Sequence, residues 1–160
     1  MDDERPAQDE TPMERSNRQL IELLNELRIV LPGITVLFGF LLAVPFARGW
    51  TQVTPFQRDV FIVAFLSTAV SIALLIAPSS YHRLRFGHGD RPRMLMISNR
   101  LSIAGITAAA VALTAVVLLV TDFVVSRGFA IAATASLLVL VVVLWYGLPL
   151  RAALRDRSSR

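Results

Sequence analysis

Ionisable side chains that could act together lie in three short stretches, each beside a long apolar run. Glu26 could form a partly desolvated ion pair with Arg83 or Arg100, and His82 beside them would titrate near neutral pH. The opposing interpretation is that arginine and histidine only reach toward lipid headgroups, while the glutamates neutralise them. We expect at least one interhelical charge pair here, because an unpaired carboxylate at an interface is unfavourable. The candidate inner-face polar cluster consists of Glu22, Glu26, Arg28, Tyr81, His82, Arg83 and Arg100.

Other reactive centres are missing from the sequence. The chain has no cysteine and no lysine, which excludes disulfides, thiolate ligands and Schiff-base chemistry. His82 and His88 are the two histidines, and no carboxylates stand near them at the spacing of a metal site. Ser79 and Ser80 precede His82, but a nucleophile would also need an orienting group and an oxyanion site. The sequence therefore predicts no enzyme, no catalytic residue, no metal and no cofactor.

Four apolar stretches separate these residues and must position them. Each runs for about 20 residues without Asp, Glu, Lys or Arg, and as a helix would cross the roughly 30 Å hydrocarbon core of a bilayer. The sequence predicts an all-α integral membrane protein, a four-helix antiparallel bundle within residues 16–150. Residues 1–15 are predicted to be a disordered acidic tail, and residues 151–160 a basic tail. The predicted spans are 29–47, 58–78, 101–121 and 129–148.

The arginines predict how these spans are oriented. Thirteen of the sixteen lie before the first span, between the second and third spans, or after the fourth. The other three are Arg48, Arg58 and Arg127, in the two remaining connections. Because short cytoplasmic loops carry the excess of arginine, both termini should face the cytoplasm. Asp59 and Asp122 then lie at the outer ends of the second and third spans. The net charge of +4 is attributed to membrane anchoring, and no nucleic-acid partner is expected.

Local patterns refine the predicted helices. From Ser16 to Leu31, leucines recur at helical spacing, which predicts an amphipathic helix on the inner membrane surface. Pro32-Gly33 then predicts a kink where this helix enters the membrane. Thr54-Pro55-Phe56-Gln57 has the pattern of a capping box with proline at the first helical position. Trp145 and Tyr146 are predicted to belong to an inner aromatic belt.

Small residues at four-residue spacing mark two candidate helix-packing sites. Gly39 and Ala43 lie in the first span, and Gly105 and Ala109 lie in the third. Such pairs let another helix approach closely. The chain is therefore expected to associate with itself, or with another membrane protein, through one of these spans.

Several of these residues also carry a resemblance to a known family. The segment Glu22–Gly33, the phenylalanines and proline of 38–46, and Ala77–Arg83 resemble a bacterial family of small four-span membrane proteins, a domain of unknown function. The resemblance covers about residues 16–150 and implies a location in the bacterial cytoplasmic membrane. Members are sometimes labelled sodium:proton antiporters. Such transport generally needs a carboxylate near the membrane midplane, and no predicted span carries one.

These observations favour a non-enzymatic role. We expect a membrane subunit, scaffold or modulator whose partners are the lipid bilayer and either a second copy or another membrane protein. The alternative is an ion- or proton-coupled transporter or channel component. It would have to be oligomeric, because four short spans enclose little aqueous space.

Overall fold

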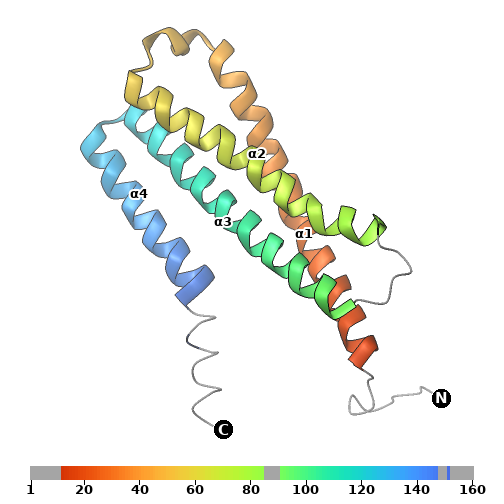
Figure 1. Cartoon of the computed structure of the whole chain (residues 1–160). Coiled ribbons are helices and arrows are strands. Elements are labelled where there is room, and N and C mark those ends of the chain that lie inside the picture. The colour runs from red at the N-terminus through yellow and green to blue at the C-terminus, as the bar shows by residue number, and fades with distance from the viewer. Residues whose placement is uncertain (1–11, 85–90, 148–150, 152–160) are drawn as a thin grey trace, which may run out of the picture.

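The computed structural model describes residues 12–84, 91–147 and 151, and all of its regular elements are helical (Figure 1). Two short 3₁₀ turns, η1 and η2, join the first two long helices, and a π-helical turn, η3, ends the last one. The elements are α1 (Pro12–Ala43), η1 (Val44–Phe46), η2 (Arg48–Gln52), α2 (Pro55–Leu84), α3 (Arg91–Val124), α4 (Arg127–Val142) and η3 (Val143–Gly147).

Four of the described helical segments are long and apolar enough to cross a membrane. Successive helices run in opposite directions (Figure 1). The prediction of an all-α, four-span antiparallel protein is therefore confirmed, and the chain is a multi-pass membrane protein. The spans are Asn25–Phe46, Pro55–Ser80, Leu95–Val124 and Arg127–Gly147.

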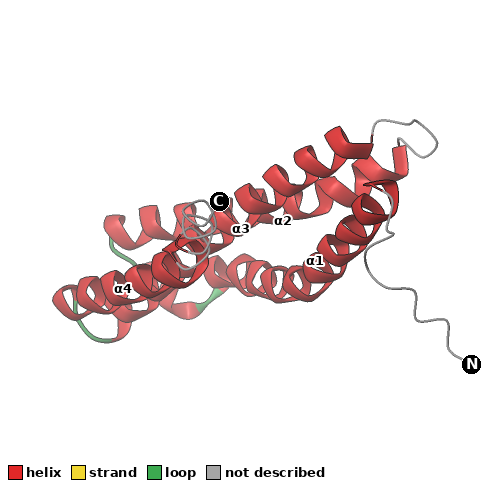
Figure 2. Ribbon diagram, turned by 90° about the horizontal axis from the view of Figure 1, so that it is seen from below, coloured by secondary structure: helices red, strands yellow, loops and turns green. Residues whose placement is uncertain are grey.

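The helices share two ends, which we name by their composition. The loop end holds η1, η2 and the turn between α3 and α4. The arginine end is where α1 and α3 begin and α2 finishes. α2 and α3 form the central pair, α1 packs on both of them, and the backbone of α4 packs along α3 alone. Figure 2 shows α4 on the side of α3 away from α1.

The contact between α2 and α3 follows a strict alternation of four- and three-residue steps. Such a 3.5-residue period keeps one face of each helix toward its partner, as in a coiled coil. The side chains that α3 buries at these steps are serine, glycine and alanine, so the two backbones can approach closely. We call this contact the small-residue seam. It comprises Gln57, Phe61, Ala64, Thr68, Ser71, Leu75 and Pro78 on α2, and Ser98, Ser102, Gly105, Ala109 and Ala112 on α3.

The closest approach in the seam is at Gly105. A Cβ atom built there would lie 2.8 Å from Leu75 Cδ2 and 3.3 Å from Leu74 Cβ. The Ser71 hydroxyl donates a hydrogen bond of 2.8 Å to the Gly105 carbonyl from across the seam. Because apolar side chains gain little by leaving lipid, close packing and interhelical hydrogen bonds must hold membrane helices together. The seam supplies both.

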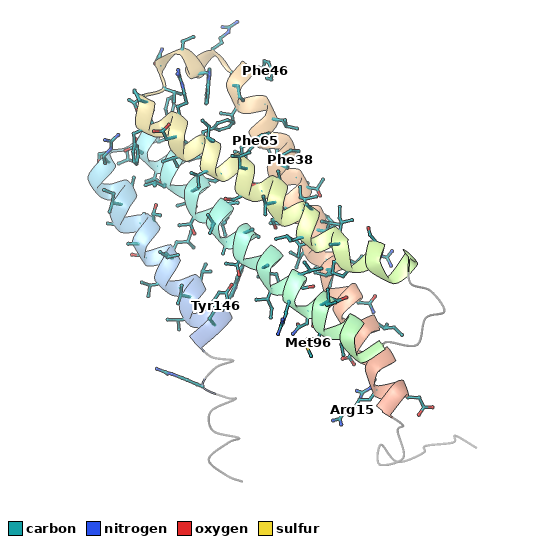
Figure 3. All side chains as sticks on the ribbon, in the orientation of Figure 1. Arg15, Phe38, Phe46, Phe65, Met96 and Tyr146 are labelled. Carbon is teal, nitrogen blue, oxygen red and sulfur yellow. The ribbon has the colours of Figure 1, made fainter. Side chains whose placement is uncertain are left out.

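Aromatic rings attach α1 and the loop end to this central pair. Phe38 of α1 stacks on Phe65 of α2 with ring centroids 5.2 Å apart (Figure 3). Phe65 stacks on Phe61, and the Trp50 ring of η2 meets Phe61 edge-on at 4.9 Å. Such aromatic pairs add to the stabilisation that area burial provides. Below them, Leu41 packs with Ala64 and Ala115, so all three helices meet in one apolar core.

Three helices are longer than the sequence predicts. α1 is one continuous helix through Pro32, so the predicted amphipathic helix and the first span belong to a single element (Figure 2). α2 likewise continues past Pro78 to Leu84, and α3 begins at Arg91. With 30 and 34 residues, α2 and α3 are roughly 45 and 51 Å long, more than a bilayer core requires. Helix-breaking residues are tolerated in membrane helices, because neighbouring groups compensate for the lost backbone hydrogen bond.

α4 is shorter than α3 and is tied to it by a hydroxyl pair. Tyr146 Oη lies 2.6 Å from Thr107 Oγ1, and Thr107 donates its own proton to the Ile103 carbonyl. The tyrosine is therefore the donor in this pair. The Tyr146 hydroxyl therefore contributes to the packing of α4 on α3. Tyr146 also lies next to the end of the fourth span, and its place in an inner aromatic belt stays a prediction.

The seam predicts opposite effects for two glycine-to-alanine substitutions. We expect Gly105→Ala to destabilise the protein by about 1–3 kcal/mol, because the new methyl group overpacks against buried Leu75. Gly39→Ala is the matched control: nothing lies within 4 Å of its added Cβ, so it should be neutral or slightly stabilising. Thermal unfolding in detergent micelles measures both variants. Equal shifts in the two midpoints would contradict close packing at Gly105.

Candidate functional site

The described members of the predicted inner-face cluster lie at the arginine end and are exposed. Glu22 forms an ion pair with Arg18 of the same helix at 3.7 Å. Glu26 and Arg28 are exposed on either side of buried Leu27. Arg100 is exposed on α3. Among the side chains that the structure describes, this cluster contains no interhelical ion pair.

Three members of the cluster remain untested. The backbone of Tyr81, His82 and Arg83 belongs to the last turn of α2, but their side chains lie outside the described part of the structure. The interhelical pair between Glu26 and Arg83, and the titration of His82, therefore stay predictions.

The predicted helix-packing residues have two different environments. Gly105 and Ala109 are buried in the small-residue seam, where α2 covers them. Gly39 and Ala43 are exposed on α1, and no atom lies within 4 Å of a Cβ placed on Gly39. The first pair thus serves packing within the chain, while the second lies on a surface that the described helices leave open.

The best-organised polar group of the described chain is at the loop end and begins with the capping box. The Thr54 amide donates to Gln57 Oε1 at 3.0 Å, and the Gln57 amide donates to Thr54 Oγ1 at 3.3 Å. This reciprocal pair satisfies backbone groups at the start of α2, and the prediction from the sequence is confirmed. Gln57 is buried in the seam. The hydrogen bond that its Oε1 accepts from the Thr54 amide also fixes the orientation of its side-chain amide.

Asp122 is the centre of this group. Gln57 Nε2 donates to Asp122 Oδ2 at 2.8 Å, and Arg127 Nε donates to Asp122 Oδ1 at 3.2 Å. The Asp122 side chain is only 4% exposed, so the carboxylate is both buried and bound at each oxygen. One carboxylate therefore connects α2, α3 and α4. We call Thr54, Phe56, Gln57, Asp122 and Arg127 the loop-end clamp.

Arg127 completes the clamp from the first turn of α4. Its guanidinium carbon lies 4.2 Å above the centre of the Phe56 ring, a cation–π contact. Its side chain is 53% exposed, so it can cover Asp122 while keeping contact with water. A planar guanidinium suits this double role, since it can stack on a ring and donate in its plane.

The clamp has the chemistry of a structural connection. Each oxygen of the Asp122 carboxylate accepts a hydrogen bond from a side chain of another helix, which holds the three helices together. The described residues also hold no group of three His, Asp or Glu side chains that could bind a metal ion. Within the spans, the seam offers hydroxyls such as Thr68 and Ser71, which bond to carbonyls of Ala64 and Gly105.

Sequence reasoning placed the parts of the clamp without joining them. Asp122 was expected at the outer end of a span, Arg127 in the next loop, and Gln57 in a capping box. The spacing of Asp122 and Arg127 across a tight turn was an available signal. The partnership with Gln57, 65 positions away, had no local signal.

The clamp predicts coupled losses of stability. Gln57→Ala should destabilise the protein by about 1–3 kcal/mol, because it removes a buried donor to Asp122 and one half of the capping box. Gln52→Ala, at an exposed position in η2, is the matched control and should change little.

Asp122→Asn should also lower the unfolding midpoint, while Asp59→Asn, at an exposed position, should not. Combined with Gln57→Ala, Asp122→Asn should lower stability by less than the sum of the single effects, because the charge of the carboxylate strengthens the same hydrogen bond that Gln57→Ala removes. Strict additivity in this cycle would show that the two side chains do not act together.

Comparison with known proteins gives one match. No curated protein and no solved structure matches the chain. The family described as a family of unknown function (DUF6328) matches residues 9–149, which include all four spans and the loop-end clamp. The chain therefore belongs to the DUF6328 family of unknown function.

Proposed function

We propose that this protein is a non-enzymatic subunit, scaffold or modulator in the bacterial cytoplasmic membrane. It works by associating laterally with a second copy or with another membrane protein. Catalysis, metal binding and cofactor binding have no part in this role.

The observation that carries the proposal is the unequal burial of the four spans. In the most apolar stretches of α2 and α3, 28% of the residues are buried, against 6% in α1 and 11% in α4. The central pair is thus held by its own seam, while the two flanking helices present most of their surface outward. The face of α1 that includes Gly39 and Ala43 is suited to a close helix contact, because small residues there let a second backbone approach.

The position of the ionisable groups supports a passive role. In the four described spans, each ionisable residue lies within six residues of a span end. Asp122, which is buried, is already bound by Gln57 and Arg127. Ion-coupled transport usually relies on ionisable residues or broken helices near the midplane, and the described spans offer no such carboxylate.

The proposed orientation places the arginine end in the cytoplasm and the loop end outside. The excess of arginine before α1, between α2 and α3, and after α4 supports this orientation. The loop-end clamp reduces the positive charge of the outer surface, because Asp122 neutralises Arg127.

Single cysteines test the orientation, because the natural chain has none. Thr51→Cys lies at an exposed position in η2, and we expect a membrane-impermeant maleimide to label it in intact cells. Ser80→Cys, exposed at the other end of the second span, should be labelled only after the membrane is permeabilised. The reverse pattern would invert the orientation.

Purification from the native host in mild detergent tests the association. We expect a stoichiometric partner or a defined homo-oligomer, identified by mass spectrometry, and we expect Gly39→Leu to disrupt it by filling the small-residue face of α1. Ala132→Leu places a leucine of the same size at an exposed position on α4 and serves as the control. A monomer without partners that moves cations or protons in proteoliposomes would instead favour the transporter.

A further inference from the structure

A groove runs along one face of the central helix pair at membrane depth. Leu66, Val70 and Leu74 of α2 form one wall, and Ala104, Ala108 and Val111 of α3 form the other. Its volume is about 600 Å³, within the range of sites that bind small molecules. The small side chains on α3 create the hollow, because alanine leaves space that the larger residues of α2 do not fill.

On the side of the arginine end, the groove is followed along α3 by the positively charged side chain of Arg100. Arg100, Ala104, Ala108 and Val111 are spaced by four, four and three residues, so they share one face of α3. Arg100 lies one helical turn beyond Ala104, about 6 Å along the axis. Its side chain is exposed, and within the described residues it has no carboxylate partner. The groove therefore leads from the apolar span to a positive charge near the membrane surface.

One residue of the groove also contacts α4. Thr107 lines the groove, and its hydroxyl lies 2.6 Å from the Tyr146 hydroxyl. Figure 3 shows Tyr146 at the end of α4 that lies toward the arginine end. The groove itself is lined by residues of α2 and α3.

The shape and charge of the groove match one class of occupant. An acyl chain is narrow and apolar, and the bilayer supplies it at this depth. A lipid phosphate at the membrane surface would lie beside Arg100, and basic side chains near transmembrane helices attract anionic headgroups.

We propose that this groove binds an anionic phospholipid, with one acyl chain between α2 and α3 and its phosphate at Arg100. Arg100 supplies the preference for an anionic headgroup, and Ala104 and Ala108 supply the space for the chain. This site goes beyond the proposed function and does not depend on it, since a lipid can bind here whether the protein works alone or with a partner.

Native mass spectrometry of the purified full chain tests the site. Phosphatidylglycerol and phosphatidylcholine with identical acyl chains are added separately to the protein in detergent. We expect phosphatidylglycerol to bind about fivefold more tightly, the effect of one arginine near a charged headgroup. Arg100→Gln should abolish this preference, whereas Arg58→Gln, an exposed arginine near the loop end, should keep it.

A second pair of variants tests the groove itself. Ala108→Leu should weaken the binding of both lipids at least fivefold, because its side chain occupies the hollow. Ala73→Leu, at an exposed position of α2 outside the groove, should bind as the natural protein does. Thermal unfolding of each variant shows whether it is folded.

Four results would overturn the proposal. Equal binding of the two lipids to the natural protein would remove the role of the charge, as would equal behaviour of Arg100→Gln and Arg58→Gln. If Ala108→Leu binds lipid as tightly as Ala73→Leu, the groove is not the site. If Ala108→Leu instead changes the monomer–dimer equilibrium and leaves lipid binding unchanged, the groove is a contact between two copies of the chain.

Discussion

The close contact of α2 and α3 is the constraint on which the rest of the structure depends. In a bilayer, lipid tails solvate leucine as well as a protein interior does, so apolar burial gives helices little reason to associate. The small-residue seam solves this problem with short side chains and with the hydrogen bond from Ser71 to Gly105. Its regular 3.5-residue period keeps the two helices in contact over most of their length. α1 packs on both helices of this pair, and α4 packs on α3 on the side away from α1.

The attachments of the flanking helices differ in chemistry. α1 is held by aromatic stacking through Phe38 and Phe65, and by the core around Leu41. α4 is held near its two ends by polar contacts, with Arg127 on Asp122 at the loop end and Tyr146 on Thr107 near its other end. Polar contacts are directional, so they fix the register of α4 along α3. They do so although the backbone of α4 contacts neither α1 nor α2. Thr107 of this hydroxyl pair also lines the groove.

Charge is distributed so that the two ends of the protein have different properties. At the loop end, the carboxylate of Asp122 is buried and paired, which makes this end a rigid connection of three helices. At the arginine end, described side chains such as Glu26, Arg28 and Arg100 are exposed. Exposed charges are available to headgroups or to a partner, whereas the paired ones are not. The polar group with the better geometry thus joins three helices, while the arginine end and the face of α1 around Gly39 present exposed side chains.

The sequence by itself determined the helical class, the number of spans and the capping box at Thr54. These features depend on local properties, because a span is recognised from the length of one apolar stretch and a cap from four consecutive residues. It also identified Gly105 and Ala109 as packing residues, although not the helix that covers them. Continuity through Pro32 and Pro78 was not predicted, because compensation for a missing backbone donor comes from neighbouring groups. Only the tertiary structure decided that Asp122 pairs with Gln57, that the described helices leave Gly39 uncovered and that Ala104 and Ala108 line a groove. Each of these depends on the register between helices, and register is set by packing between residues far apart in the chain.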